Sequence, residues 1–210
     1  MTRRIGKLSP SLRRARYAAR RVAWAAVTCL VVAALVLADR AGLFGRAPTP
    51  DVEKYHLKSF TVVNVVDGDT IDLDCPDGDW PHTRVRLWGV DTPETVKPDT
   101  PREHFGHEAS EFTKAATLGQ TVTLELESRQ TRDKYNRLLA YVFLPDARML
   151  NRMLVETGYG YADPRYDHRY KDEFARLQRM AMKAGAGLWK DVRQQDLPYY
   201  YQGALKLPER

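Results

Sequence analysis

Apolar and polar residues alternate along much of the chain after residue 58, with the period of two that is typical of half-buried β-strands. Five segments show this alternation or a short apolar run, and we predict a strand in each: 58–66, 70–75, 83–90, 121–127 and 138–144. The first three follow one another closely, which favours an antiparallel meander. The hydrophobic pattern therefore predicts a domain built mainly from short strands.

Three further segments place apolar residues at the spacing of an α-helix. The first carries Phe105, Ala109, Phe112 and Ala116 and ends near Gly119; the second runs from about 148 to 157; the third carries Tyr170, Phe174, Leu177 and Ala181. Glycines follow the second and third segments, as is common just beyond a helix end. This order of elements predicts a β-rich α+β fold, a five-stranded Greek-key barrel of OB type with three helices.

The segment from Val22 to Ala38 contains seventeen uncharged, largely apolar residues. A helix of this length spans about 25 Å, the short end of what crosses a bilayer. Eight Lys/Arg and no acidic residue precede it, so the positive-inside rule predicts a cytoplasmic tail over 1–21 and a C-terminal domain outside the cytoplasm. We predict one uncleaved transmembrane helix. The alternatives are a signal peptide cleaved after Val36-Leu37-Ala38, which would give a secreted protein, and a surface-lying or buried helix.

Charge is distributed unevenly along the chain. The net charge is +6, but the first 46 residues carry ten of the 33 Lys/Arg and one of the 27 acidic residues, which leaves −3 on the remainder. Nucleic-acid binding by the folded domain would therefore need a local group of cations or a metal ion. Residues 39–57 lack periodicity and are predicted to be a linker, 58–190 the folded domain and 191–210 a C-terminal tail.

Carboxylates gather at two predicted strand ends. The Asp-Gly-Asp motif at 67–69 lies between two strands and is typical of a hairpin turn, with Gly68 supplying a permissive backbone. The Asp-Thr-Pro-Glu motif at 91–94 follows the third strand, which Pro93 ends because it has no amide donor. Turn formation explains either motif alone. If the strands pair, however, the carboxylates meet beside Arg86, and oxygen ligands suit a hard cation such as calcium or magnesium.

Three motifs together resemble the staphylococcal nuclease (thermonuclease) family. They are 66–71 (Val-Asp-Gly-Asp-Thr-Ile), 86–95 (Arg-Leu-Trp-Gly-Val-Asp-Thr-Pro-Glu-Thr) and 133–141 (Asp-Lys-Tyr-Asn-Arg-Leu-Leu-Ala-Tyr). Their order and spacings are similar to those of the family, over roughly Lys58 to Trp189. The resemblance implies the same barrel with helices packed against it. It also implies a calcium-dependent endonuclease, a hydrolase that cleaves the phosphodiester bonds of DNA and RNA with little sequence specificity.

The resemblance implies a metal site and a general base. One calcium ion would be held by Asp69, Asp91 and the backbone carbonyl of Thr92, with Asp67 close by. Calcium is expected in preference to magnesium. Glu94 would be the general base that positions or deprotonates the attacking water.

Substrate contacts are implied in the same way. Arg86 and Arg137 would bind the scissile phosphate, and a guanidinium offers a fork geometry that a lysine does not. Lys134 and Tyr135 match family positions that touch substrate phosphate. Tyr166 is a candidate for stacking on the base, and packing within its loop is an equally good interpretation.

Two functions of different classes are compatible with these residues. The first is the nuclease; the second is a non-catalytic OB-fold module that binds nucleic acid or a protein. The full set of motif residues favours the enzyme, because a module that only binds has no need of Glu94. We expect a monomer whose partners are DNA and RNA as substrates and the membrane through residues 22–38.

Overall fold

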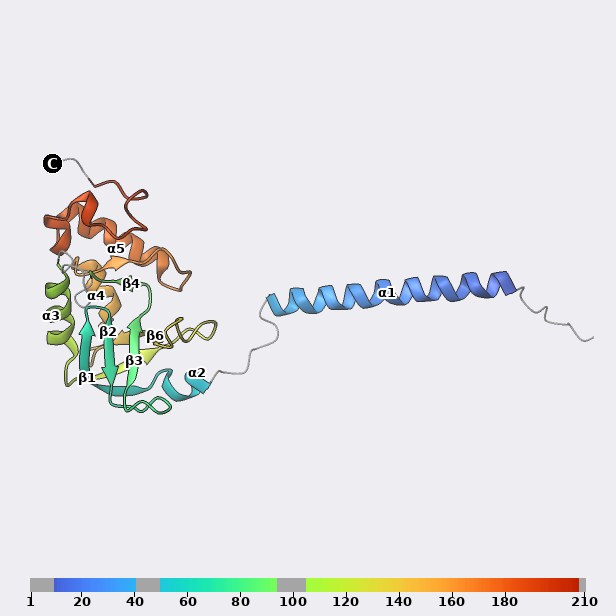
Figure 1. Ribbon diagram of the computed structural model, residues 1–210, viewed down its shortest axis with the longest axis horizontal. Helices are drawn as coiled ribbons and strands as arrows, with labels where there is room; N and C mark the ends of the chain where they lie inside the picture. The colour runs from blue at the N-terminus through green and yellow to red at the C-terminus, as the bar shows by residue number, and fades with distance from the viewer. Residues whose placement is uncertain (1–9, 41–49, 94–104, 208–210) are drawn as a thin grey trace, which may run out of the picture. The chain divides into compact units, whose positions relative to one another are not determined.

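The computed structural model describes residues 10–40, 50–93 and 105–207, drawn as a ribbon in Figure 1. The chain separates into two compact units, Met1–Ala47 and Pro48–Arg210, and each is described by itself. Helix α1 (Pro10–Arg40) forms the described part of the first unit. It begins well before the predicted apolar segment, because Ala, Arg and Leu, which are good helix formers, dominate its first turns. Within α1, Arg20–Leu37 is long and apolar enough to cross a membrane, a criterion that a signal sequence also meets.

The second unit is built on a closed barrel of five strands. The strands are β1 (Ser59–Asp67), β2 (Thr70–Leu73), β3 (Thr83–Leu87), β5 (Thr121–Glu125) and β6 (Leu138–Phe143). Their order is β1-β2-β3-β6-β5, and β5 pairs with β1 to close the barrel. Neighbouring strands are antiparallel except β3 and β6, which are parallel. The barrel confirms the predicted fold, although several strands end earlier than the hydrophobic pattern indicated.

Apolar residues that alternate along the strands fill the barrel. Val62, Ile71, Val85 and Leu124 are fully buried, and burying an aliphatic side chain of this size contributes about 1.5–3 kcal/mol. Strand β6 differs, because the residues from Leu138 to Val142 are all buried rather than every second one. One face of β6 lines the barrel and the other is covered by α4 (Leu150–Glu156). A strand covered on both faces has a continuous apolar sequence, which explains the run seen there.

The three predicted helices are present: α3 (Gly106–Thr117), α4 and α5 (Lys171–Ala184). Helix α3 packs on β1, whereas α4 lies between β6 and α5. Buried Asn151 connects α4 to the strands, because its Oδ1 accepts from the amide of Val142 at 2.9 Å and its Nδ2 donates to the carbonyl of Trp88 at 3.0 Å. Short 3-10 helices, η1 (Gly187–Lys190) and η2 (Gln194–Asp196), follow α5.

A short helix, α2 (Pro50–Tyr55), lies within the segment that the sequence analysis interpreted as a linker. Tyr55 is fully buried in the main core, and its hydroxyl lies 3.0 Å from Oγ1 of Thr83. Asp51 accepts hydrogen bonds from Arg132 at 2.7 and 2.9 Å. The packed domain therefore begins before residue 58. A single aromatic residue in a polar segment has no period, so the hydrophobic pattern did not reveal it.

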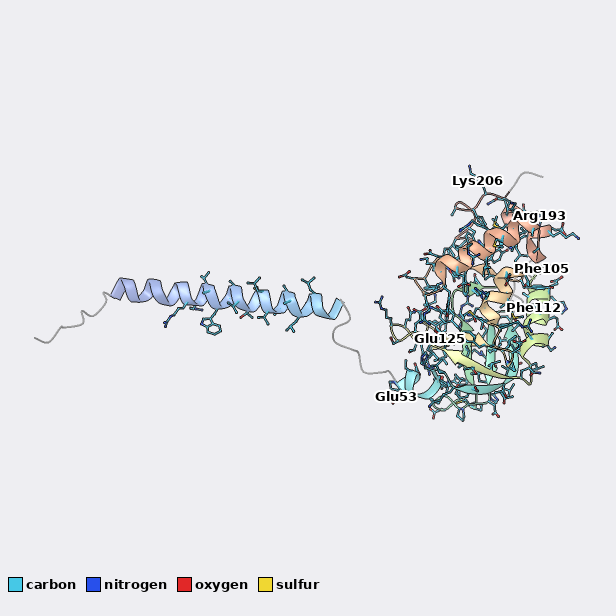
Figure 2. All side chains as sticks on the ribbon, turned by 180° about the vertical axis from the view of Figure 1, so that it is seen from behind. Glu53, Phe105, Phe112, Glu125, Arg193 and Lys206 are labelled. Carbon is cyan, nitrogen blue, oxygen red and sulfur yellow. The ribbon has the colours of Figure 1, made fainter. Side chains whose placement is uncertain are left out.

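The described part of the predicted C-terminal tail is packed onto the domain. Leu197 and Tyr201 belong to a second core cluster with Trp189 and Leu188. The hydroxyl of Tyr201 donates to the carbonyl of Ala162 at 2.5 Å. In Figure 2, the labels of Arg193 and Lys206 mark the end of the domain where this segment lies. The segment from 191 to 207 is thus part of the fold.

Two short strands outside the barrel bring distant parts of the sequence together. Strand β4 (Val90–Asp91) pairs antiparallel with β7 (Tyr161–Ala162), which places Asp91 opposite Tyr161. The preceding Gly89 has a φ of +76°, and a Cβ there would lie 2.3 Å from Cε1 of His168. Only glycine allows both this backbone conformation and this contact. The pairing brings Asp91 next to the segment after β7, a neighbour that the sequence pattern did not indicate.

Candidate active site

Asp69, Arg86 and Asp91 meet at one end of the barrel strands. Asp69 lies in the β1–β2 turn, Arg86 on β3 and Asp91 on β4. Nη1 of Arg86 donates to Oδ1 of Asp69 at 2.8 Å, and its Nη2 donates to Oδ1 of Asp91. The second oxygen of Asp69 accepts from the amide of Thr92 at 3.1 Å. One guanidinium therefore bridges the two carboxylates that the sequence analysis assigned to a metal.

The turn that carries Asp69 is held in place by its glycine and by α3. A Cβ at Gly68 would lie 2.8 Å from Oγ1 of Thr92 and 2.9 Å from Cβ of Ala109, so a side chain there would push the turn away. The carbonyl of Gly68 accepts from Oγ1 of Thr113 on α3 at 2.6 Å. The hairpin turn was predicted correctly, but Gly68 does not have a positive φ. Close approach, rather than backbone conformation, is the reason for glycine.

Burial disfavours the ionised form of Asp69 unless positive charge lies beside it. Asp69 is only 2% exposed, and burial raises its pKa well above the usual range. Arg86 lowers this pKa, whereas the carboxylates of Asp67 and Asp91 raise it further. Burial alone would lower the pKa of Arg86, but Asp69 and Asp91 raise it, so the guanidinium stays charged. Arg86 thus faces more than one carboxylate, and additional positive charge beside these carboxylates favours their ionised form.

The donor set fits a hard divalent cation. Within the described ranges, no three His, Cys, Asp or Glu side chains converge as a complete cluster of metal ligands. The convergent pair is Asp69 and Asp91, both held by Arg86. Oδ1 of Asp67 accepts from the backbone amide of Asp69 at 3.2 Å. Two carboxylates and a backbone carbonyl, completed by water, are ordinary ligands for calcium or magnesium. Asp69, Asp91 and the carbonyl of Thr92 would hold such an ion.

The loop that carries Lys134, Tyr135 and Arg137 is organised by the side chain of Asp133. Its Oδ1 accepts from the amides of Tyr135 and Arg137, both at 2.9 Å, and its Oδ2 accepts from Nε of Arg137 at 2.7 Å. Asn136 takes a positive φ of 64°, which an asparagine tolerates better than most residues. Lys134 and Arg137 both lie beside the ring of Tyr135. Asp133 was part of the quoted motif, but its positioning role became visible only in the structure.

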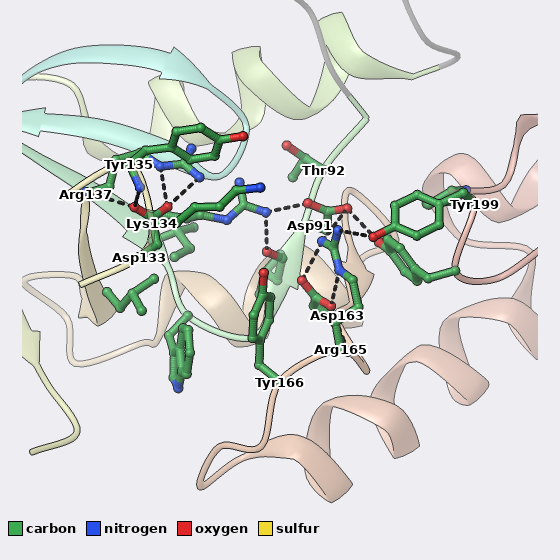
Figure 3. Close-up of a pocket in the computed structure, with 18 of the residues that line it drawn as sticks. Asp91, Thr92, Asp133, Lys134, Tyr135, Arg137, Asp163, Arg165, Tyr166 and Tyr199 are labelled. Atoms are coloured by element: carbon green, nitrogen blue, oxygen red, sulfur yellow. Dashed lines mark hydrogen bonds and ion pairs between the residues drawn. The ribbon is translucent and has the colours of Figure 1, made fainter. Parts of the chain in front are cut away.

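These groups line one cleft of about 880 Å³, shown in Figure 3. The predicted site residues in its lining are Arg86, Asp91, Thr92, Lys134, Tyr135, Arg137 and Tyr166. Asp69 lies behind them, where it contacts Arg86. The ring of Tyr166 packs 5.4 Å from that of Trp88 and remains 42% exposed. Glu94, the predicted general base, lies outside the described residues.

The other wall of the cleft contains residues that the sequence analysis did not assign. The hydroxyl of Tyr200 donates to Oδ2 of Asp91 at 2.6 Å, and Nη2 of Arg165 lies 3.2 Å from the same oxygen. Arg165 also pairs with buried Asp163 at 2.6 Å and lies 4.2 Å from the ring centre of Tyr200. Burial, and then the charge of Asp91, raise the pKa of Tyr200, so its hydroxyl keeps the proton that it donates.

A weak sequence signal for this wall did exist. The run Pro-Tyr-Tyr-Tyr at 198–201 places three adjacent aromatic residues in a segment otherwise interpreted as a tail. The Asp-Pro-Arg-Tyr run at 163–166 likewise puts an acid and a base two residues apart. Neither run shows by itself that residues of both runs meet at Asp91.

Comparison with known proteins agrees with this geometry. The family described as staphylococcal nuclease homologue matches residues 84–191. A thermonuclease from Staphylococcus hyicus is 35% identical over 166 residues, which cover 79% of this chain and 94% of that protein. A thermonuclease from Staphylococcus intermedius is 44% identical over 135 residues, or 63% of this chain and 77% of that protein. The SPbeta prophage-derived endonuclease YokF of Bacillus subtilis (strain 168) is 32% identical over 135 residues, or 63% of this chain and 44% of that protein.

The fold and the cleft together define a small OB-type barrel protein with paired carboxylates and arginines at one end of its strands. The matched segment includes Arg86, Asp91 and Arg137, and the similarity to the S. hyicus protein extends over most of both chains. The chain belongs to the staphylococcal nuclease family. The resemblance seen in the three motifs is therefore confirmed.

Proposed function

We propose that this chain is a calcium-dependent nuclease that hydrolyses the phosphodiester bonds of DNA and RNA. Family membership supports nuclease activity, and the names of the relatives, thermonuclease and endonuclease, agree with it. One structural observation carries the proposal. Arg86 bridges Asp69 and Asp91 in the same cleft that Arg137 and Lys134 line. Anionic ligands for a cation and cationic ligands for a phosphate are thus side by side.

Phosphodiester hydrolysis needs negative charge to be neutralised on the oxygens of the transferred phosphoryl group. We assign this role to Arg86 and Arg137, which both line the cleft. A guanidinium can present paired N–H donors to a phosphate. A bound calcium ion would supply further neutralisation of that charge. Glu94 is proposed as the base that takes the proton of the attacking water, on the strength of the family motif. Lys134 would add a point charge at the edge of the cleft.

The alternative is a module of the same fold that binds nucleic acid without cleaving it. The two functions are distinguished by incubating the full-length chain, in detergent, with single-stranded DNA, duplex DNA and RNA. Each incubation is run with calcium, with magnesium and with excess chelator. We expect cleavage of all three substrates with calcium and none with chelator. Binding without cleavage under every condition would support the alternative, and undiminished cleavage in chelator would contradict the metal dependence.

A matched pair of variants tests the role of the carboxylates. Asp69 is the third residue of the Asp-Gly-Asp motif at 67–69, and Asp79 is the third residue of the same tripeptide at 77–79. Asp79 lies in an exposed loop between β2 and β3, outside the cleft lining. Asp69→Ala should abolish calcium-dependent cleavage, whereas Asp79→Ala should leave it unchanged. Equal activity of the two variants would contradict the assignment of Asp69.

A further inference from the structure

The cleft has an exposed aromatic ring at each end. At one end, Tyr135 is 68% exposed and lies in the loop with Lys134 and Arg137. At the other end, Tyr199 is 74% exposed, and its ring centre lies 5.8 Å from the guanidinium carbon of Arg165. Figure 3 shows Tyr135 and Tyr199 on opposite sides of the drawn site. Rings at both ends of a cleft that holds the candidate catalytic groups provide surfaces for the planar parts of a long substrate.

Tyr199 is exposed, yet the two residues that follow it are held in place. The next residue, Tyr200, donates to Asp91 at 2.6 Å, and Tyr201 is buried with its hydroxyl on the carbonyl of Ala162. The rings of Tyr199 and Tyr200 pack edge to face, with centres 5.3 Å apart. A ring that is held in this way loses little conformational freedom when a ligand stacks on it. Exposure of such a ring in the cleft therefore favours a binding role.

The residues at this end of the cleft suit a nucleobase. Arg165 is already paired with Asp163 at 2.6 and 2.8 Å and lies 3.2 Å from Asp91. Its positive charge is thus shared with two carboxylates, as that of Arg86 is, so the exposed ring is what distinguishes this end of the cleft. The ring of Tyr199 offers an aromatic surface. Nucleobases stack on such rings with little regard to sequence, because every base has a π-face.

We propose that Tyr199 is a stacking platform for a nucleobase of single-stranded substrate, at the end of the cleft opposite Tyr135. The inference rests on the proposed nuclease function and adds to it a base subsite carried by the C-terminal segment. The cleft has a volume of about 880 Å³. Pockets for one small ligand have volumes of roughly 300–1,000 Å³, so this cleft can hold more than one nucleotide of a strand. Tyr166 is less available, because one of its faces packs against Trp88.

Competition between two octamers tests the subsite. The full-length chain, in detergent with calcium, cleaves a fluorescent DNA reporter in the presence of octathymidylate or of an abasic octamer with the same phosphates and no bases. Tyr199→Ala should raise the inhibition constant of octathymidylate about tenfold, as expected for one lost base stack, and leave that of the abasic octamer unchanged. Tyr199→Phe should keep the affinity of the unsubstituted chain, because stacking needs the ring and not the hydroxyl.

Trp80→Ala is the matched control. Trp80 is a 72% exposed aromatic residue outside the cleft lining, so its removal should change neither inhibition constant. The subsite would be contradicted if Tyr199→Ala bound octathymidylate as tightly as the unsubstituted chain, or if it lost affinity equally for both octamers. Absence of reporter cleavage by the unsubstituted chain would instead contradict the proposed nuclease function.

Discussion

At the scale of single residues, the orientation of Asp91 is the central feature of the site. Its Oδ1 accepts from Arg86, and its Oδ2 accepts from Tyr200 at 2.6 Å with Arg165 at 3.2 Å. Both oxygens are thus held by neighbours. Hydrogen bonds from outside the ligand set orient metal ligands in many proteins, and their loss commonly lowers metal affinity 10- to 100-fold. Asp91 would therefore depend on a residue of the C-terminal segment.

Removing the hydroxyl of Tyr200 tests this dependence. Tyr200→Phe keeps the ring beneath Arg165 but deletes the hydrogen bond to Asp91, so we expect calcium affinity to fall about tenfold. Isothermal titration of the full-length chain with calcium measures the change without reference to activity. Tyr201→Phe is the control, because its hydroxyl bonds to Ala162 and Gln178 rather than to Asp91. Equal calcium affinities for the two variants would contradict a role of Tyr200 in orienting Asp91.

The proposed general base and phosphate ligand should both be needed for a normal kcat. Glu94→Gln should lower kcat by about 10²- to 10⁴-fold, because general-base catalysis contributes an acceleration of that size, while KM changes less. Arg86→Lys should also lower kcat strongly, since an ammonium replaces a fork of donors with a point charge. Steady-state kinetics on single-stranded DNA separates kcat from KM for each variant. Near-normal kcat for Glu94→Gln would show that another group is the base.

At the scale of elements, the position of the β3–β4 connection depends on its attachment to α4. Asn151 reaches from α4 to the carbonyls of Trp88 and Ala140 and accepts from the amide of Val142. Trp88 immediately precedes the Gly89 turn that leads to Asp91. A fully buried amide side chain thus joins α4 to β6 and to the connection that follows the strand carrying Arg86.

Replacing this amide by an apolar side chain of similar size tests its contribution. Asn151→Leu removes the partner of the Val142 amide and of the Trp88 carbonyl, whereas the Ala140 carbonyl keeps its bond from the Trp88 amide. An unpaired buried group costs about 1–3 kcal/mol, so we expect the free energy of unfolding to fall by at least about 2 kcal/mol. Urea unfolding followed by tryptophan fluorescence measures it. Arg152→Leu is the control, since the Arg152–Glu173 ion pair is exposed and should contribute at most about 1 kcal/mol. A smaller loss for Asn151 than for Arg152 would contradict this account.

At the scale of the whole molecule, the chain contains a nuclease-family domain and, before it, a helix with a basic N-terminal part and an apolar C-terminal part. Helix α1 contains a stretch, Arg20–Leu37, with the length and composition of a membrane span. Eight cations and no acid precede Val22, and we propose that this asymmetry keeps residues 1–21 in the cytoplasm and the domain outside it. A nuclease with little sequence specificity would then be kept from the genome of its own cell.

The orientation predicts a result for protease treatment of membranes. In right-side-out vesicles from cells that express the full-length chain, the domain should be digested by protease added outside and should fractionate with the membrane. In inverted vesicles the same domain should be protected until detergent is added. Protection in the right-side-out vesicles would reverse the proposed orientation. A soluble mature form that begins near Asp39 would support the cleaved signal peptide instead.

The sequence by itself determined the features that repeat locally or lie within a short motif. Alternation of apolar residues predicted the five strands, because burial of one strand face imposes a period of two. The motifs around Asp69, Asp91 and Arg137 indicated the family, because each is a short run of residues at a turn or strand end that can be recognised without the fold. The apolar segment of α1 was visible for the same reason, since its composition is local.

Only the tertiary structure decided which distant residues complete the site. Tyr200 meets Asp91 across 109 positions of sequence, and Arg165 reaches the same oxygen from the segment after β7. Tyr55 likewise enters the core from a segment with no periodic pattern. Such contacts depend on the β4–β7 pairing and on the docking of the C-terminal segment, each of which is stabilised by long-range packing. A single side chain that is ordered by residues distant in the sequence shows no period along its own segment. A local pattern therefore cannot predict its contacts.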